Sequence, residues 1–214
     1  MQCPACESES SFTQTELLDK FKMWRCNTCG LEFSDPMVSE RDFYNRLYSD
    51  SEMTDLCKYT GFANQLKRWG NGIPQGKGKY AIKSYESLAV DILRRRFHKE
   101  DYILDFGCGS GRFLAGLRDF GFSPLGIDIA EEPIRALKSI GFEVACGTIN
   151  SIPQSWPTPK AITLFEVLEH LPNPLTFLKS LSEKYPASLL ILSVPSPSRW
   201  YLWHGKREPE DYPP

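Results

Sequence analysis

The chain has 214 residues, of which 41% are hydrophobic and 24% are charged, with a formal net charge of −2. This composition is typical of a globular protein with one ordinary domain and a small addition, and the charge gives no general attraction to nucleic acid. No apolar run reaches the ~18 residues that a membrane span needs, and the opening Met-Gln-Cys-Pro-Ala-Cys is not a secretion signal. We therefore expect a cytoplasmic protein with no membrane insertion.

Two C-x-x-C pairs stand near the start of the chain, Cys3 with Cys6 and Cys26 with Cys29, and 19 residues separate them. Each pair can bring two thiolates to one metal ion, and four thiolates suit tetrahedral zinc. The odd total of seven cysteines argues for metal ligands and buried thiols rather than a disulfide framework. We predict a zinc-ribbon-like domain over residues 1–35, with a hairpin between the pairs and a structural zinc ion. Iron, or no metal, is the alternative.

Residues 36–79 are predicted to form a linker and helical segment, with a helix near residues 39–48 and a glycine-rich loop at residues 70–78 that marks a boundary. A basic segment, residues 58–99, holds ten basic and two acidic residues, a net charge of +8. This segment is either a solvated helix face with a basic loop, or a patch for an anionic acceptor.

From residue 80 onward, helical and strand patterns alternate. Helices are expected at 80–97, 112–120 and 130–140, and strands at 102–106, 124–129, 142–146, 161–165 and 188–194. Strands separated by helices indicate a mostly parallel sheet with right-handed crossovers. Residues 80–214 are therefore predicted to be an α/β domain with a Rossmann-like sheet.

A glycine-rich turn, residues 107–111, lies between an expected strand and an expected helix. Glycines let the backbone bend sharply and approach a ligand, and the start of the helix adds free N–H groups, so we expect main-chain amides to surround a nucleotide-like ligand here. Asp128 closes the next strand, 17 residues after Gly111, where a carboxylate can accept hydrogen bonds from ribose hydroxyls. A dinucleotide fingerprint is not met, because Arg112 or Leu114 stands where the last glycine belongs.

With Asp105 ahead of the glycines, the turn reads D-x-G-x-G-x-G and closely resembles motif I of class I S-adenosylmethionine-dependent methyltransferases. Residues 165–171, Phe-Glu-Val-Leu-Glu-His-Leu, are similar to the E-V-L-E-H segment that closes strand four in many small-molecule members of that family. The resemblance covers about residues 80–195. It implies S-adenosylmethionine as cofactor, with its amino-acid part in the glycine loop, Asp105 supporting the loop and Asp128 holding the ribose. The cofactor-binding residues predicted in this way are Asp105, Gly107, Cys108, Gly109, Gly111, Asp128, Ile129, Thr148, Phe165 and Glu166.

The chain departs from the family pattern in three places. No acid follows the third strand, so Thr148, Asn150 or the backbone must contact the adenine, and Lys160 stands where strand four often opens with an acid. The family sheet has seven strands, and the pattern here gives five. We therefore expect a sheet that lacks the last two strands, as in a C-terminally incomplete fragment or a shortened family member.

Methyl transfer to oxygen or nitrogen requires that a proton be removed from the acceptor. His170 and Glu169 are the predicted catalytic residues, with His170 as general base because its intrinsic pKa lies near the working pH. In the alternative, His170 packs the loop while Glu166 or Glu169 bonds the backbone or the cofactor, or a Glu–His pair binds a metal. The aromatic residues Tyr201 and Trp203 either line the acceptor pocket or belong to a core.

Three functions fit these patterns. The favoured one is a methyltransferase for a small-molecule acceptor such as a sugar, a lipid-linked intermediate or a natural product. The second is an RNA- or protein-modifying methyltransferase that uses the zinc ribbon and the basic segment to hold a macromolecule. The third is a binding module that keeps the cofactor fold without turnover. The isolated Cys57, Cys108 and Cys146 are interpreted as packing residues. Nothing in the sequence indicates the oligomeric state.

Overall fold

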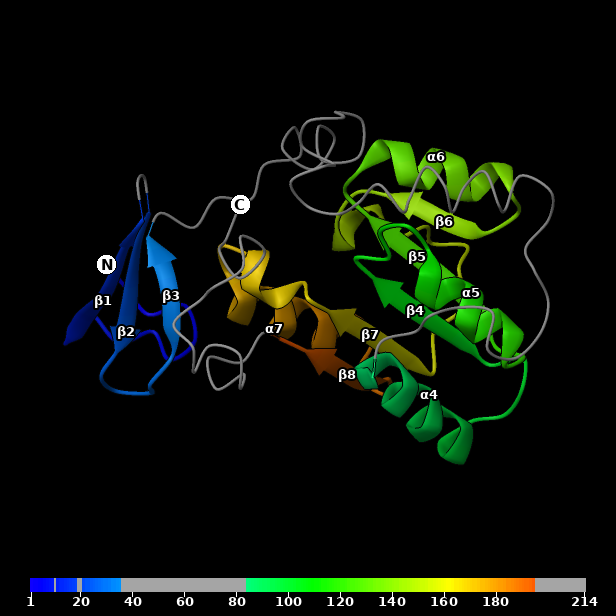
Figure 1. Cartoon of the computed structure of the whole chain (residues 1–214). Helices are drawn as coiled ribbons and strands as arrows, with labels where there is room; N and C mark the ends of the chain where they lie inside the picture. The colour runs from blue at the N-terminus through cyan, green and yellow to red at the C-terminus, as the bar shows by residue number, and fades with distance from the viewer. Residues whose placement is uncertain (10, 19–20, 36–83, 195–214) are drawn as a thin grey trace. The chain divides into compact units, whose positions relative to one another are not determined.

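The computed structural model describes residues 1–9, 11–18, 21–35 and 84–194 (Figure 1). The helix expected near residues 39–48, the loop at 70–78, Cys57, and the aromatic residues Tyr201 and Trp203 lie outside these residues. The chain divides into two compact units. One includes the N-terminal strands and the segment Glu166–Pro186, and the other includes the large sheet with its first three helices. Each unit is described by itself below.

The N-terminal part is a small antiparallel sheet in the order β1-β2-β3. Its strands are β1 (Phe12–Leu18), β2 (Phe21–Cys26) and β3 (Glu32–Asp35). Strands β1 and β2 form the hairpin expected between the cysteine pairs, and β3 is an addition. The core of this sheet consists of Cys3, Cys26 and Phe33, with Phe12 and Trp24 packed against them. So small an apolar cluster buries little surface, and a domain of this size commonly needs a metal or disulfides to fold.

The large sheet has five parallel strands in the order β6-β5-β4-β7-β8 within the described residues, as Figure 1 shows. The strands are β4 (Tyr102–Phe106), β5 (Ser123–Asp128), β6 (Glu143–Cys146), β7 (Ala161–Phe165) and β8 (Leu189–Ser193). Each lies within one residue of its predicted bounds, so the predicted α/β fold with a parallel Rossmann-like sheet is confirmed.

Four α-helices and two short 3-10 turns are described in this part of the chain. They are α4 (Ser84–Arg96), α5 (Arg112–Asp119), α6 (Glu131–Ser139), α7 (Pro174–Lys184), η1 (Ile149–Ser151) and η2 (Leu168–His170). Helices α4, α5 and α6 correspond to the predicted ones, and α7 was not predicted. Among the described residues, no helix is long and apolar enough to cross a membrane.

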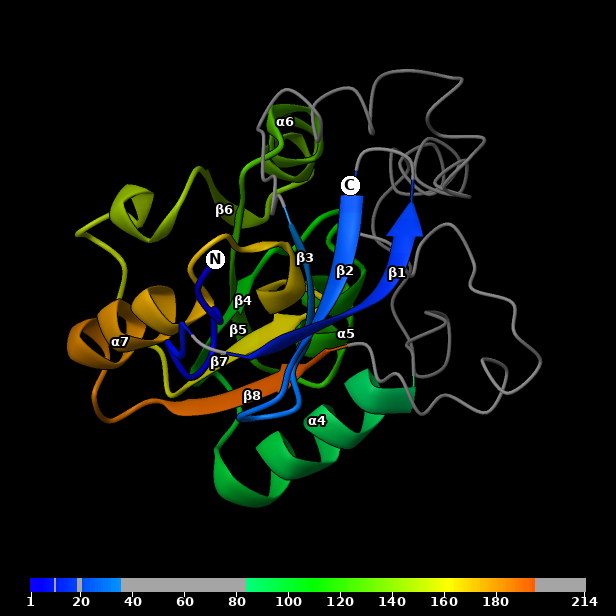
Figure 2. The same ribbon diagram turned by 90° about the vertical axis from the view of Figure 1, so that its left-hand side faces the viewer.

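Helices α4, α5 and α6 share one face of the large sheet (Figures 1 and 2). Ile103 of β4 and Ala161 of β7 are register partners, and both belong to the cluster that α4 and α5 cover. Helices α5 and α6 cover a second cluster, which includes Val144 of β6. On the opposite face of the strands, Leu104 and Leu125 are register partners and are also buried. Burial on both faces explains why the central strands β4, β5 and β7 read as short apolar runs rather than as alternating patterns, whereas Leu190 and Leu192 of β8 are exposed.

Helices α5 and α6 end in the same backbone motif, in which a glycine follows the C-cap residue, Phe120 or Ile140. At the end of α5, the Phe122 N–H donates to the Leu117 carbonyl oxygen at 3.0 Å, and the Phe142 N–H does the same to Leu137 after α6. These bonds satisfy carbonyl groups that a helix end leaves without partners, and they require a positive φ at the glycine between. Gly121 and Gly141 have φ values of 91° and 81°, so both glycines take the conformation that ends the helix.

Candidate functional site

The glycine loop leaves the central strand of the large sheet. Strand β4 pairs with β5 on one side and with β7 on the other, so the chain moves outward from β4 in two directions. In open α/β sheets, the crevice at the carboxyl ends of the strands where the order reverses is where ligands bind. The loop of residues 107–111, between β4 and α5, lies at that reversal.

The glycine loop is held in a conformation that side chains disfavour. Gly107, Gly109 and Gly111 all have a positive φ, at 79°, 46° and 73°. A Cβ atom at Gly111 would clash with the side chain of Leu137, so a side chain at this position would also require Leu137 to move. The N–H groups of Gly107 and Cys108 donate to the Ile127 carbonyl oxygen at 2.8 and 3.0 Å. These bonds tie the loop to β5.

Asp128 joins the loop to the start of α6. Its Oδ2 accepts a hydrogen bond from the Gly109 N–H at 2.8 Å, and its Oδ1 accepts one from the Ala130 N–H at 2.9 Å. Burial raises the pKa of this carboxyl, and the N–H groups of Ala130 and Gly109 act in the opposite direction. The loop amides therefore serve the protein's own acceptors, which differs from the expectation that they face the ligand. A carboxylate has about four lone-pair sites, so Asp128 keeps acceptor capacity for a ligand.

Asp105 lies buried in β4 beside β7. It is 4% exposed, and its Oδ1 accepts a hydrogen bond from the Thr163 Oγ1 hydroxyl at 2.7 Å. Burial, helped by the negative charges of Glu86 and Asp128, raises the pKa of Asp105 to about 7, against the bond from Thr163. Thr163 is the register partner of Asp105 across the two strands. Because register cannot be read from sequence, this partner was missed.

A half-buried ion pair stands beside the loop, with the Arg112 side chain 31% exposed and that of Glu86 4% exposed. Arg112, the first residue of α5, donates from Nη2 to Glu86 Oε1 of α4 at 2.6 Å. Glu86 is 3% exposed. Sequence reasoning noted Arg112 only as a side chain too large for a dinucleotide loop, and it missed Glu86 because 26 residues separate the two.

Phe165, at the end of β7, packs between two helices. Its ring centroid lies 5.4 Å from that of Tyr85 in α4 and 5.0 Å from that of Phe113 in α5, the latter edge to face. This predicted cofactor residue therefore has aromatic neighbours on the helix-covered face of the sheet.

The remaining predicted cofactor residues have local roles in the fold. Cys108 is buried, and burial raises the pKa of its thiol well above the usual range. The Ile129 carbonyl oxygen accepts from the Cys146 thiol at 3.5 Å. Thr148 is exposed and forms a capping box with Ser151 at η1. Cys108 thus packs as expected for a protonated thiol.

Glu166, Glu169 and His170 follow β7 and belong to the other compact unit. All three are half-buried. Glu166 has φ 56°, which is uncommon for a residue with a long side chain and costs conformational energy. Burial lowers the pKa of His170, and the charge of Glu166 partly offsets this effect. A lowered pKa keeps an imidazole neutral near pH 7, the form that accepts a proton.

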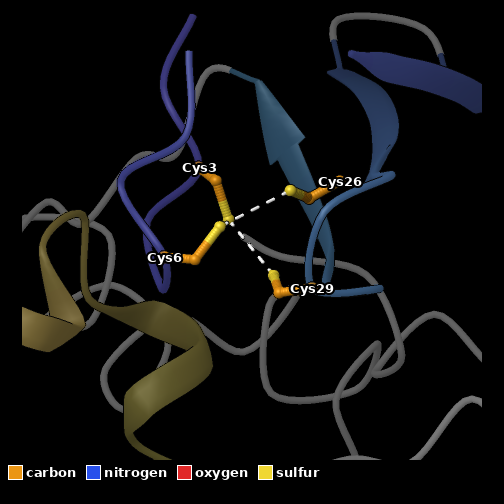
Figure 3. Close-up of side chains that lie close together, drawn as sticks. All are labelled: Cys3, Cys6, Cys26 and Cys29. Atoms are coloured by element: carbon orange, nitrogen blue, oxygen red, sulfur yellow. Dashed lines mark hydrogen bonds between the residues drawn. The ribbon is translucent and has the colours of Figure 1, made fainter. Parts of the chain in front are cut away.

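The four cysteines of the two C-x-x-C pairs converge (Figure 3). Their sulfur atoms all lie within 4.8 Å of one another. Cys3 Sγ lies 3.6 Å from Cys29 Sγ, and Cys6 Sγ lies 3.7 Å from Cys26 Sγ. A disulfide needs about 2.05 Å, whereas four sulfurs at about 2.3 Å from a tetrahedral zinc are about 3.8 Å apart.

One thiol of the cluster is set up to ionise. The backbone N–H of Cys29 lowers the pKa of Cys26 to about 6, with a smaller contribution from Thr28 and against the effect of burial. Thiolates are the metal-binding form of cysteine. The arrangement is thus compatible with a zinc site.

Comparison with curated proteins identifies relatives named ubiquinone biosynthesis O-methyltransferase. The protein of that name from Xanthomonas campestris pv. campestris (strain B100) is 25% identical over 158 residues, which cover 68% of this chain and 62% of that protein. The one from Coxiella burnetii (strain Dugway 5J108-111) is 26% identical over 133 residues, 59% of this chain and 54% of that protein. The chain thus spans less than two thirds of the length of these relatives.

Among solved structures, the plantazolicin methyltransferase BpumL in complex with a pentazolic desmethylPZN analog and SAH is similar in fold. The TM-score is 0.51 at 18% sequence identity, and the similarity covers 80% of this chain and 64% of that one. At this identity the similarity concerns the fold alone.

Residues 79–211 match the family described as a methyltransferase domain, which is more than half of the chain. The match includes the glycine loop, Asp128 and the segment after β7. The parallel sheet, the loop at its order reversal and this match agree with one another, and the chain belongs to the methyltransferase domain family.

Proposed function

We propose that this protein is an S-adenosylmethionine-dependent methyltransferase that acts on a small-molecule acceptor. The observation that carries the proposal is the glycine loop fixed between Ile127 and Asp128, with a carboxylate at the carboxyl edge of β5. The relatives named for ubiquinone biosynthesis and the fold similarity to a plantazolicin methyltransferase support a small or natural-product acceptor.

The residues around the loop suit a cationic cofactor. Three buried or half-buried carboxyl groups, those of Glu86, Asp105 and Asp128, accompany one cation, Arg112. Asp128 retains acceptor capacity for a ribose hydroxyl beyond its backbone partners. When bound, S-adenosylmethionine supplies a methyl group activated by a positively charged sulfur. The protein aligns the acceptor with this methyl group. Gly107, Gly109 and Gly111 would lie at the amino-acid end of the cofactor.

We propose His170 as the general base, with Glu169 beside it in sequence. The half-buried imidazole is kept neutral by its lowered pKa, as a base for an acceptor hydroxyl or amine requires.

A small acceptor is favoured over RNA because the basic residues of α4 have a local explanation. Arg94, Arg95 and Arg96 form the last turn of α4, where cations interact favourably with the helix dipole. The Arg94 guanidinium also lies over the Phe120 ring, 5.6 Å from its centroid. The helix dipole and the contact of Arg94 with Phe120 give these arginines roles within the fold, so their presence does not require an anionic partner such as RNA.

We further propose that the four cysteines hold a structural zinc ion and that residues 1–35 form a zinc-ribbon-like domain. Four protein ligands leave no open coordination position, so the ion would stabilise the fold rather than take part in catalysis. Residues 36–79 would then connect it, as a linker and helical segment, to a methyltransferase domain over residues 80–214.

Two measurements test the function. Calorimetric titration of the purified protein with S-adenosylmethionine should give one site per chain, and no binding would refute the proposal. The protein is then incubated with methyl-labelled cofactor and a cell extract separated into small molecules, RNA and protein. We expect label in the small-molecule fraction. Label confined to RNA or protein would instead favour a macromolecular acceptor.

A further inference from the structure

The first turn of α4 contacts the elements that form two sides of the proposed cofactor site. Glu86 pairs with Arg112, which directly follows the glycine loop. Tyr85, its neighbour, packs on Phe165, the last residue of β7. One helical turn therefore reaches the segments that follow β4 and end β7, on the two sides of the sheet's order reversal.

Arg112 stands where its charge is unfavourable to its own helix. It is the first residue of α5, after the N-cap residue Gly111, and the start of a helix carries partial positive charge. A cation in this place must be stabilised by something outside the helix. Glu86 supplies that stabilisation at 2.6 Å, and because Glu86 is 3% exposed while the Arg112 side chain is 31% exposed, solvent screens the pair less than it would a fully exposed one.

The ion pair also affects the pKa of Asp105, the residue expected to support the glycine loop. The Glu86 carboxylate raises the pKa of Asp105, and the Arg112 guanidinium lowers it to a smaller extent, so each partner offsets part of the effect of the other. Loss of either partner would leave an uncompensated charge next to a carboxyl group that is already buried. A buried charge left without its partner is costly.

We propose that Glu86 and Arg112 are positioning residues for the cofactor, and that their ion pair holds the glycine loop in its binding conformation from helix α4. The inference rests on the proposed function. Neither residue needs to touch the cofactor, because the pair acts through the Gly111–Arg112 peptide and the start of α5. The contact of Tyr85 with Phe165 gives α4 a second point of attachment to the same site.

The test is the affinity for S-adenosylmethionine of Arg112→Met and Glu86→Gln, measured by calorimetry below the unfolding temperature of each variant. We expect each variant to raise Kd about tenfold or more, the loss expected for one hydrogen bond to a charged group. The conservative Arg112→Lys keeps a cation within reach of Glu86 and should restore most of the affinity. The double variant Glu86→Gln with Arg112→Met should cost less than the sum of the single variants, because it leaves no unpaired charge.

The control is the exposed pair of Arg135 with Glu132 on α6, whose closest atoms are 3.2 Å apart. Arg135→Met removes a guanidinium of the same kind and should leave Kd unchanged. The inference is overturned if Arg112→Met melts at a lower temperature while Kd stays at the wild-type value, since that would be a purely structural role. If Arg112→Met does not fold, Glu86→Gln decides by the same criterion. Failure of the wild-type protein to bind would instead contradict the proposed function.

Discussion

At the scale of single residues, Asp128 connects the loop to β5 and α6. Because its two oxygens already accept the N–H groups of Gly109 and Ala130, its substitution affects both the loop and the proposed ribose site. Asp128→Ala should weaken the binding of S-adenosylmethionine by about 1–3 kcal/mol, the range for hydrogen bonds to a charged group. Calorimetric titration measures this change.

A matched control for Asp128 is Asp101. Its Oδ2 accepts the His98 N–H at 2.8 Å, so it also binds a backbone amide, but it precedes β4 rather than following β5. Asp101→Ala should leave the cofactor affinity unchanged. Equal affinities for wild type and Asp128→Ala would contradict the ribose role.

Asp105 predicts a dependence of stability on pH. Its pKa is about 7 in the folded protein and near 3.8 when exposed, so the folded state holds the proton more tightly. The free energy of unfolding should therefore decrease as pH rises between these two values. From pH 5 to pH 8 this contribution is about 2–3 kcal/mol. Asp105→Asn keeps an acceptor for Thr163 and removes the titration.

Urea unfolding of wild type and Asp105→Asn at several pH values measures the Asp105 contribution. The difference between the two proteins cancels the contribution of the cysteine cluster, which titrates in both. A difference that stays constant from pH 5 to pH 8 would show that Asp105 ionises at its ordinary pKa.

His170 is the residue whose proposed chemistry has the clearest kinetic signature. His170→Gln should lower kcat about 10²- to 10⁴-fold, the usual contribution of a general base, with little change in cofactor affinity. Because burial lowers its pKa, the acid limb of the wild-type pH profile should lie below 6.5. His98→Gln, which replaces an exposed histidine, is the control. An unchanged kcat in His170→Gln would assign His170 to packing.

At the scale of elements, the turn after β7 stores conformational strain at Glu166. A long side chain at φ 56° costs about 1–2 kcal/mol relative to glycine. Glu166→Gly should therefore leave the melting temperature unchanged or raise it, while activity falls because the carboxylate is gone. Thermal unfolding and initial rates measure the two effects. A clear loss of stability would mean that contacts of the Glu166 side chain outweigh the strain.

Most elements of the large sheet could be predicted, because short apolar strands alternate with helical patterns and a glycine follows two of the helices, α5 and α6. Helix α7 had a signal that was overlooked. Its first residue, Pro174, suits a helix start, and Leu175, Leu178 and Leu181 recur at three-residue spacing. Strand β3 has four residues, too few for a periodic pattern.

The candidate site was predictable only where its residues are adjacent in sequence or spaced by a motif. The glycine loop, Asp105 and Asp128 follow a recognisable spacing. Thr163 and Glu86 do not, since their contacts depend on strand register and on helix packing across 58 and 26 residues. Contacts of this kind can be identified only from the three-dimensional structure.

At the scale of the whole molecule, the cysteine cluster predicts that the N-terminal part can lose its order without loss of the cofactor site. Cys26→Ser removes one of four thiolates and should release zinc, because a small core supplies little folding energy of its own. Affinity for S-adenosylmethionine should stay within about twofold of wild type, well below the tenfold change that 1.4 kcal/mol produces.

Metal analysis by mass spectrometry and proteolysis of the N-terminal region check this prediction. Cys146→Ser is the control, since Cys146 is half-buried at the end of β6 and lies outside the cluster. Stoichiometric zinc retained in Cys26→Ser would refute the ligand assignment, and iron in the wild-type protein would change the identity of the metal.

The pairing of β4 with β7 has a consequence for the order in which the protein folds. The hairpin of β1 and β2 joins neighbouring residues, whereas Asp105 meets Thr163 only after 58 residues of intervening chain have been gathered. Contacts between distant residues form late because closing a long loop costs entropy first. During synthesis, Asp105 should therefore remain hydrated and ionised until β7 arrives, and its uptake of a proton would report the completion of the sheet.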